Sequence, residues 1–247
     1  MSLVKKRLFI CLIHGKGRNY LSYLRPKLFM EVIPYSKEEL ALIYGIMLGD
    51  GCLSKVGDHH YFLEICGHIE DDLDFLEKIK PIIERIRGRS VKIKKRPNLG
   101  KLEMNFSDKN VFFLFKSLGF PVGKKGTSLT ISPFFKEESY KEIVKGYFAT
   151  DGCLVITNNN GTLYPRIEFS SISKPLLIQV LSYLKKKGMS GGLYLSHKPK
   201  NNWNPLYRIQ FNGKTNLDKF IDVIGFINPK HAIKLEAYKK KSGGDGL

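Results

Sequence analysis

The sequence has no apolar run near its start that is long enough to anchor it in a membrane. The longest early run, Leu8–Ile13, follows three basic residues and is only six residues long. A membrane-spanning helix needs about 20 such residues, and no small-residue cleavage site follows the run, as a signal peptide would require. We therefore expect no membrane partner and no secretion, and a protein of the cytoplasm, associated with the nucleoid, or of an organelle.

Cysteine is scarce, and its spacing fits neither a zinc site nor a disulfide framework. The four cysteines are Cys11, Cys52, Cys66 and Cys153. Two Cys-His fragments occur, but no second Cys or His pair completes either of them. We expect reduced, structural cysteines in a reducing compartment, with Cys52 and Cys153 as small buried residues.

Acidic residues are few compared with basic ones. The 247 residues contain 23 Asp and Glu against 41 Lys and Arg, which gives a formal net charge of +18. This excess favours a polyanionic partner such as DNA, RNA or an anionic membrane. The hydrophobic share of 43% is that of a globular protein with one large or two small domains.

One nine-residue pattern, Gly-x-x-x-x-Asp-Gly-Cys-Leu, occurs twice. It covers Gly45–Leu53 and Gly146–Leu154, and each copy ends an apolar, helix-compatible run. Small residues at Gly45 and Gly49, and at Gly146 and Thr150, would let two helices approach closely. The pattern therefore predicts two motif helices, Ile43–Asp50 and Val144–Asp151, packed side by side.

Each copy of the pattern places an aspartate at the expected end of its helix. Asp50 and Asp151 would be presented out of the packed pair, and Gly51 and Gly152 are expected to stop the helices in a left-handed turn. An acidic residue at a helix C-terminus is disfavoured by the helix dipole, by about 0.3–1 kcal/mol. Its presence at both ends favours use in chemistry over simple capping.

The two motifs resemble those of the LAGLIDADG homing endonucleases. The glycine and Asp-Gly positions of that family motif fall on Gly45, Asp50 and Gly51, and again on their counterparts in the second copy. The remaining letters match only as apolar or small residue types. The resemblance covers about residues 36–238. It implies a site-specific double-strand DNA endonuclease that is monomeric, intron-encoded and metal-dependent.

The repeat extends beyond the motifs and predicts the fold. Leu63–Ile65 matches Ile167–Phe169, and Met104–Phe106 matches Ile209–Phe211. Each copy is expected to run helix, two strands, helix, two strands, helix. The fold class is then α+β, with two pseudo-symmetric αββαββα repeats, antiparallel sheets that form a DNA-binding saddle, and the motif helices at the central interface. The expected parts are a basic extension at 1–35, repeats at 36–132 and 133–238, and a flexible tail at 239–247.

The second strand pair of each repeat alternates between apolar and polar residues. Period-two alternation predicts sheets with one face on helices and one polar face open. The polar residues are of the types that contact phosphates and base edges. The DNA-binding candidates are Lys92, Lys94, Lys95, Arg96, Lys101, His197, Lys198, Lys200, Arg208 and Gln210.

The paired aspartates suggest a metal site. Two nearby carboxylates repel each other unless a cation lies between them, and Mg²⁺ prefers oxygen ligands together with waters and substrate phosphates. We expect Asp50 and Asp151, with the preceding Gly49 and Thr150, to hold Mg²⁺ or Mn²⁺. Each aspartate would serve one scissile strand.

The family resemblance also implies a supporting lysine in each repeat and a polar residue in the water network. Lys124 and Lys230 occupy matching positions and are the candidates, with Lys125 a close rival to Lys124. His68 fits the polar position in the first repeat. Its counterpart, near Ile172, is apolar, so the two halves need not be equivalent.

The expected partner is double-stranded DNA with a long, imperfectly palindromic site, because the repeats differ in their polar residues. Two alternatives stay open on the same scaffold. One is an intron maturase that binds intron RNA, and the other is a DNA-binding regulator whose nuclease core is degenerate.

Overall fold

The computed structural model describes residues 34–197 and 203–242. The predicted basic extension therefore lies almost entirely outside the described residues. The same is true of the candidates Lys198 and Lys200, and of the side chain of His197. The rest of the chain alternates helices and strands in the predicted order.

The first repeat contains three helices and four strands. In chain order they are α1 (Lys37–Asp50), β1 (Gly51–Val56), β2 (His60–His68), α2 (Leu73–Arg87), β3 (Ile93–Arg96), β4 (Lys101–Ser107) and α3 (Lys109–Ser117), with a short 3₁₀ turn, η2 (Pro97–Leu99), between β3 and β4.

The second repeat has the same order, and a further helix follows it. A 3₁₀ turn, η3 (Glu137–Ser139), leads into α4 (Tyr140–Asp151), β5 (Gly152–Asn159), β6 (Thr162–Ser171), α5 (Lys174–Lys186), β7 (Gly191–His197), β8 (Leu206–Asn212), α6 (Lys214–Val223) and α7 (Pro229–Ser242). Helix α7 was not expected, and it continues to Ser242 where a flexible tail was predicted from residue 239. Buried His231, Leu235 and Tyr238 hold one side of this helix against the rest of the protein.

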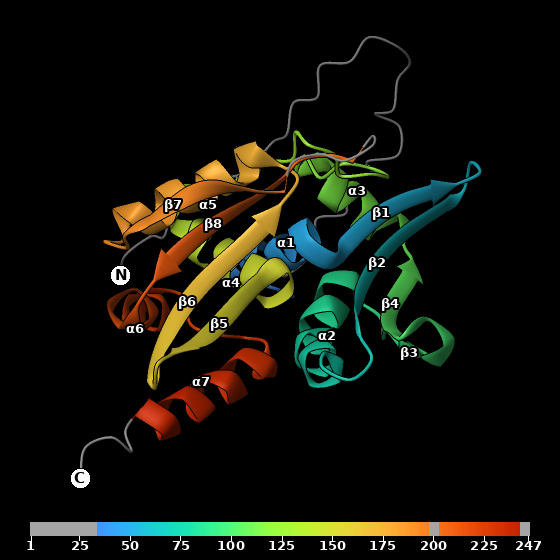
Figure 1. Ribbon diagram of the computed structural model, residues 1–247. Helices are drawn as coiled ribbons and strands as arrows, with labels where there is room; N and C mark the ends of the chain where they lie inside the picture. The colour runs from blue at the N-terminus through green and yellow to red at the C-terminus, as the bar shows by residue number, and fades with distance from the viewer. Residues whose placement is uncertain (1–33, 198–202, 243–247) are drawn as a thin grey trace, which may run out of the picture. The chain divides into compact units, whose positions relative to one another are not determined.

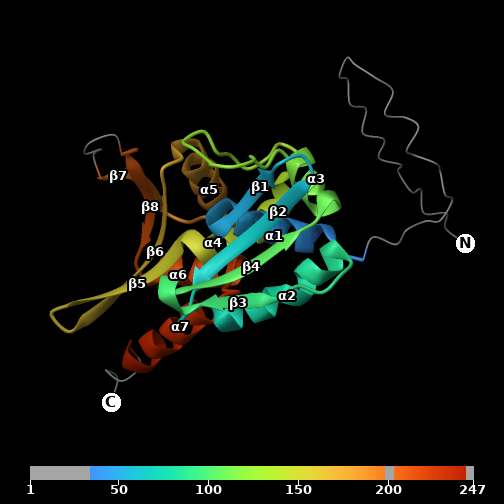
Figure 2. The same cartoon turned by 90° about the vertical axis from the view of Figure 1, so that its right-hand side faces the viewer.

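Each repeat forms one antiparallel sheet, with strand orders β1-β2-β4-β3 and β5-β6-β8-β7. Helices α2 and α3 pack on the first sheet, and α5 and α6 pack on the second. Figures 1 and 2 show α1 and α4 side by side between the two sheets, each running into the first strand of its own repeat. The predicted α+β fold of two αββαββα repeats is confirmed.

The contact between α1 and α4 is the most extensive between any two elements, and it depends on small residues. A Cβ atom added at Gly45 would lie 2.1 Å from the carbonyl oxygen of Ile143, and one added at Gly146 would lie 2.2 Å from that of Leu42. Backbone therefore touches backbone where the helices cross, as the motif predicted.

The glycines after the aspartates do not have the predicted left-handed conformation. Gly51 has φ −89° and ψ 155°, and Gly152 has φ −89° and ψ 156°, so both are extended and begin strands. Glycine is needed here for space, because a Cβ at Gly51 would lie 2.4 Å from Cα of Met47. Each helix passes into a strand without a turn, which leaves its last residue at the junction.

The first helices of the two repeats begin differently. Ser36 and Glu39 form a capping box at the start of α1, in which each side chain accepts a hydrogen bond from the backbone of the other residue. Ser139 lies at the N-cap of α4 but makes no capping bond with its side chain. Ser139 is the last residue of the η3 turn, so its backbone is already helical.

The alternation of the strands holds, with one exception. Leu102, Met104 and Ile209 are fully buried against the helices. Leu195 was expected on the apolar face but is 48% exposed. Leu195 still pairs with Tyr207, on the face of Ile209, and the register of β7 against β8 shifts only after it, between Leu195 and His197.

Candidate active site between the motif helices

The two motif aspartates end neighbouring helices and lie close together. Asp50 is the last residue of α1, and Asp151 is the last residue of α4. A Cβ added at Gly49 would lie 3.3 Å from Cγ of Asp151 and 2.0 Å from Oγ1 of Thr150. The carboxyl group of Asp151 is thus packed beside the residue that precedes Asp50, as the architectural prediction required.

Both carboxyl groups have raised pKa values. Burial raises the pKa of Asp151 to about 7, the charge of Asp50 adds to this, and Lys125 opposes it. Loss of surrounding water also raises the pKa of Asp50, although its side chain keeps a solvent-exposed surface. Two carboxylates at one point repel each other, so the pair favours either a proton or a cation between its members.

Lys125 supplies a positive charge at the aspartates. Its ammonium group donates hydrogen bonds to the carbonyl oxygens of Met47, at 3.3 Å, and of Leu48, at 3.1 Å, and also to that of Gly49. These carbonyls form the open C-terminal end of α1, where cations are favoured. Burial lowers the pKa of Lys125, while the charges of Asp151 and Asp50 raise it.

The structure places Lys125, and not Lys124, at the aspartates. Lys124 is exposed, whereas Lys125 is half-buried against α1. Both follow Gly123, whose backbone N–H donates to the carbonyl of Leu53 at 2.7 Å and fixes the path of this segment. Matching the two repeats could not decide between two adjacent lysines, because it does not reveal the length of the loop that precedes them.

Lys230, the predicted lysine of the second repeat, is held by a carboxylate of the first repeat. Its Nζ lies 2.9 Å from Oδ1 of Asp72. The same Oδ1 accepts from Nδ2 of Asn228 at 2.9 Å, and Oδ2 accepts from the backbone N–H of His68 at 2.8 Å. Burial acts to raise the pKa of Asp72, but these hydrogen bonds outweigh it and hold the pKa below its usual value.

The other predicted site residues lie at the rim or are already bonded. His68 ends β2 with an exposed ring, whose Nδ1 is 3.4 Å from Oδ2 of Asp71. The Thr150 hydroxyl donates to the carbonyl of Tyr147 within its own helix, at 3.0 Å. The Gly49 carbonyl accepts from Lys125. In the described geometry, the side chains free to meet a ligand are the two aspartates.

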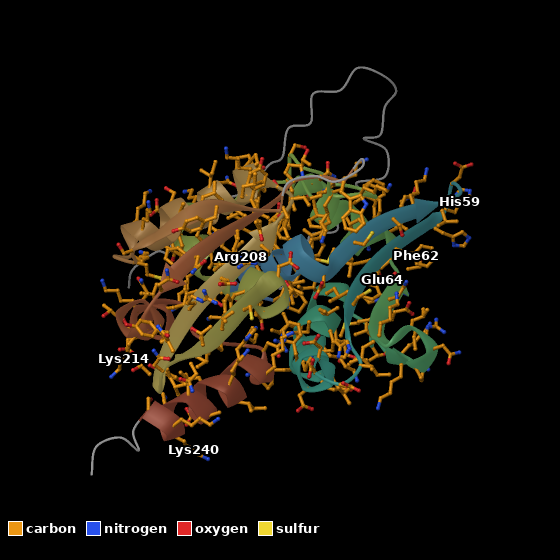
Figure 3. The ribbon with its side chains drawn as sticks, viewed as in Figure 1. His59, Phe62, Glu64, Arg208, Lys214 and Lys240 are labelled. Atoms are coloured by element: carbon orange, nitrogen blue, oxygen red, sulfur yellow. The ribbon has the colours of Figure 1, made fainter. Side chains whose placement is uncertain are left out.

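The open face of the first sheet carries a network of paired charges. Glu64, labelled in Figure 3, accepts from Nδ2 of Asn105 at 2.9 Å and lies 3.3 Å from Lys101. Glu103 lies 2.9 Å from both Lys101 and Arg96. The hydrogen bond with Lys101 contributes most to lowering the pKa of Glu103. Lys101 and Arg96 on this face are therefore held in place by acids.

The second sheet has an acid at the matching place but different neighbours. Glu168 is 8% exposed, and it lies 3.5 Å from Arg166 and 3.4 Å from Arg208. Arg208, also labelled in Figure 3, donates to Oγ of Ser196 at 3.2 Å. Here two arginines flank one buried acid, where the first sheet has lysine, arginine and asparagine around two acids.

The described DNA-binding candidates are accessible, but not all share one face. Lys101 lies on the open face of β4, and Lys94 pairs across the strands with Glu103 on the same face. Lys95 is opposite buried Leu102 and so belongs to the helix-facing side, although it is exposed at the sheet edge. The others with described side chains, all exposed or half-buried, are Lys92, Arg96, Arg208 and Gln210.

The described cysteines are free, but they are not the buried residues predicted. Cys52 and Cys66 are half-buried, and Cys153 is exposed. Cys52 and Cys153 pair across the strands with Glu64 and Glu168, so they lie on the open faces. Leu53 and Leu154 take the buried positions instead, because Gly51 and Gly152 already begin the strands.

Sequence reasoning missed several residues of the site. Glu64 and Glu168 were visible as part of the matching strand repeat, but nothing marked them as charges on an open face. Asp72 and Asn228 had no signal, since they are far apart in the chain and meet only across the interface between repeats.

The side chains at the site fit a metal ion that takes only some of its ligands from the protein. Within residues 34–197 and 203–242, no group of three or more His, Cys, Asp or Glu side chains is arranged to hold a metal. Two carboxylates suit Mg²⁺, which keeps several waters and takes substrate phosphates as further ligands. Among the described helices, none has the length and apolar character needed to cross a membrane.

Comparison with known proteins gives one family match, over part of the chain. The family model for a LAGLIDADG-like domain matches residues 138–225, within the second repeat. An uncharacterized protein of Methanocaldococcus jannaschii is 25% identical over 218 residues, covering 84% of this chain and 24% of that protein. The chain thus spans about a quarter of the length of this curated relative.

Solved structures of homing endonucleases share the fold. I-DmoI in complex with DNA and Ca has a TM-score of 0.58 at 18% identity, covering 81% of this chain and 97% of that one. I-LtrWI, a LAGLIDADG homing endonuclease bound to its target DNA, has a TM-score of 0.52 at 11% identity, covering 83% and 88%. This chain therefore has the two-repeat fold of the LAGLIDADG homing endonucleases, and its second half contains a LAGLIDADG-like domain.

Proposed function

We propose that this protein is a site-specific double-strand DNA endonuclease that acts as a monomer. The observation that carries the proposal is the pair Asp50 and Asp151 at the meeting ends of two helices, with Lys125 beside them. Two carboxylates at one point are suited to hold a cation and orient a water, and a nearby ammonium group is suited to neutralise charge on a phosphoryl group. The solved structures with this fold include endonucleases bound to DNA.

A divalent cation, Mg²⁺ or Mn²⁺, is proposed to bind at the two aspartates. When bound, it would stabilise the charge that develops on the phosphodiester oxygens. The chain itself contributes the two carboxylates, whose pKa values are raised first by burial and, for Asp151, also by the charge of Asp50. Structures with this fold have been described with Ca and with Mn.

Lys125 and Lys230 are proposed to support the site from its two sides. The ammonium group of Lys125 is fixed by three carbonyls at the end of α1. It would attract the scissile phosphate without blocking the aspartates. The role of Lys124, and that of His68 in the water network, stays a prediction.

The open faces of the two sheets are proposed to bind the DNA duplex. The first face offers Lys94, Arg96 and Lys101, and the second offers Arg208 and Gln210. Because the two sets differ, the target should be a long and imperfectly palindromic site. The net charge of +18 supports phosphate contacts on either side of the site.

The test is cleavage of a duplex selected from a randomised library, with Mg²⁺ and with Mn²⁺. Asp50→Asn and Asp151→Asn should each abolish double-strand cleavage and largely preserve binding, with nicking of one strand left if each carboxylate serves mainly one strand. Asp222→Asn removes one carboxylate on the exposed side of α6, so it is the matched control and should cleave normally. Metal-dependent cleavage that survives both substitutions would falsify the assignment.

The same experiment distinguishes the alternatives. Tight binding to a structured intron RNA, with no preferred duplex recovered, would indicate a maturase. Selection of a duplex that the protein binds but does not cut with either metal would indicate a DNA-binding regulator.

A further inference from the structure

The two lysines at the site are held in different ways. Lys125 rests on backbone carbonyls at the end of α1. Lys230 forms an ion pair of 2.9 Å with Asp72, a carboxylate from the other repeat. Only one of the two cations is therefore positioned by an acid.

Asp72 is committed to this contact. Its side chain is 8% exposed, and both of its oxygens accept hydrogen bonds, from Asn228, Lys230 and the backbone of His68. It lies at the N-cap of α2 yet makes no capping bond, although aspartate is among the best N-cap residues. The carboxylate therefore bonds to the other repeat and does not cap its own helix.

The equivalent residue in the second repeat behaves differently. Ser173, the N-cap of α5, accepts from the backbone N–H of Leu176 and donates to the carbonyl of Leu129 at 2.6 Å. Its hydroxyl therefore caps the helix and cannot form an ion pair with Lys125. The N-cap of the second helix is thus an acid in the first repeat and a serine in the second.

The link also reaches the end of the second motif helix. Nδ2 of Asn228 donates to Oδ1 of Asp72 and to the carbonyl of Ala149, at 2.9 Å in each case. Ala149 lies two residues before Asp151. Asn228 is fully buried. The contacts from Asp72 thus connect α2 of one repeat to both Lys230 and the end of α4 in the other.

We propose that Asp72 is a positioning residue for Lys230, and that it makes the two halves of the site unequal, so that one DNA strand depends on Asp72 and the other does not. This rests on the proposed nuclease function. A long lysine side chain loses conformational freedom when it is held, and a charge-assisted hydrogen bond to a buried carboxylate fixes it strongly. In the described part of the chain, Asp72 is the carboxylate that forms an ion pair with Lys230, while Asp50 interacts with it only through its charge.

The first experiment measures each strand separately. Asp72→Asn and the control Asp74→Asn remove the same charge from the same end of α2, but Asp74 is exposed. In single-turnover cleavage of the selected duplex, labelled on either strand, Asp72→Asn should slow one strand by about tenfold, the size expected for one lost charge-assisted contact. The other strand, and both strands in the control, should keep their rates.

Epistasis separates positioning from a general loss of structure. Lys230→Met should slow the same strand as Asp72→Asn, and the double variant should be no slower than Lys230→Met alone. Equal slowing of both strands by Asp72→Asn, or additive effects in the double variant, would overturn the proposal. Since Lys230→Met retains Asp72 with its bonds to Asn228 and His68, it keeps the test open if Asp72→Asn does not fold.

A second readout does not depend on cleavage. Lysine labelling with an amine-reactive reagent, followed by peptide mass spectrometry, should show a severalfold increase at Lys230 in Asp72→Asn and no change at Lys125. Absence of cleavage by the unaltered chain would remove the proposed nuclease function, and the labelling would still decide whether Asp72 holds Lys230. Unchanged labelling at Lys230 would overturn the proposal on its own.

Discussion

The two repeats are alike where they touch each other and unlike where they face the expected substrate. At the contact between α1 and α4, which we call the seam, Gly45 and Gly146 are equivalent. A Cβ added at either would collide with the backbone of the other helix at nearly the same distance. Around the site, Lys125 sits on carbonyls while Lys230 pairs with Asp72. On the open faces, the two sheets share a central glutamate and differ in most of its partners.

This difference reflects how tightly each position is constrained. A residue between two packed helices must fit both, because the interior is dense and overpacking costs energy. A side chain on an open sheet face meets only solvent until a ligand binds, so the repeats can diverge there at little cost to stability. The seam thus keeps the two aspartates close together, while the open sheet faces can give each repeat its own preference for a DNA sequence.

The largest expected effect tests whether the two sides of the seam are equivalent. Gly45→Ala and Gly146→Ala should each lower the free energy of unfolding by about 3 kcal/mol or more, because the backbones must separate. Urea denaturation of the two variants checks this. Their costs should be similar if the seam is symmetric.

Gly57→Ala provides the control for this comparison. Gly57 has φ +58° in the β1–β2 turn, and a Cβ there would meet nothing within 4 Å. Its cost should be limited to the left-handed backbone, about 1 kcal/mol. Seam variants no worse than this control would mean that the helices can move apart freely.

A smaller effect should distinguish the two aspartates. The pKa of Asp151 is raised to about 7 in the folded protein from an ordinary value of 3.8. The neutral form is therefore favoured by folding, and the stability it provides is complete below about pH 4 and is lost as the pH rises to about 7. In the absence of divalent metal, Asp151→Asn should remove this loss and stabilise the protein at pH 8 by about 1–3 kcal/mol.

Asp50→Asn should stabilise the protein less, because Asp50 is exposed and two lysines oppose the rise of its pKa. Thermal unfolding of the three proteins between pH 4 and pH 8 would measure the difference. Equal curves for the two variants would show that the aspartates are equivalent despite their different surroundings.

The smallest effect concerns the open faces. Arg208→Ala should relax the preference for one half-site by about 1–3 kcal/mol if the arginine contacts a base edge, and should weaken all sequences alike if it contacts phosphate. Lys94→Ala should act on the opposite half-site. Selection from a randomised duplex library gives the preference, and the slope of affinity against salt, roughly −0.9 per neutralised phosphate, gives the number of phosphate contacts. Effects of both variants on the same half-site would contradict the assignment of one sheet to each half.

Much of the fold could be read from the sequence, because it depends on local patterns. The nine-residue repeat gave the motif helices and their contact, and the alternation at Leu102 and Met104 gave a strand and its buried face. The errors lie where the chain departs from a simple period. They include the exposure of Leu195, next to the register shift of β7, and α7, which packs on β5 and β6 of the second repeat.

The sequence by itself determined that two aspartates follow two close-packing helices, since glycine spacing and the Asp-Gly pair are local features. It could not determine which lysine reaches them or what holds that lysine. The choice of Lys125 over Lys124 depends on the path of the chain after Gly123, which is fixed by a backbone hydrogen bond to β1. The contact of Asp72 with Asn228 and Lys230 joins residues far apart in the chain, and it exists only because the helix seam brings the repeats together.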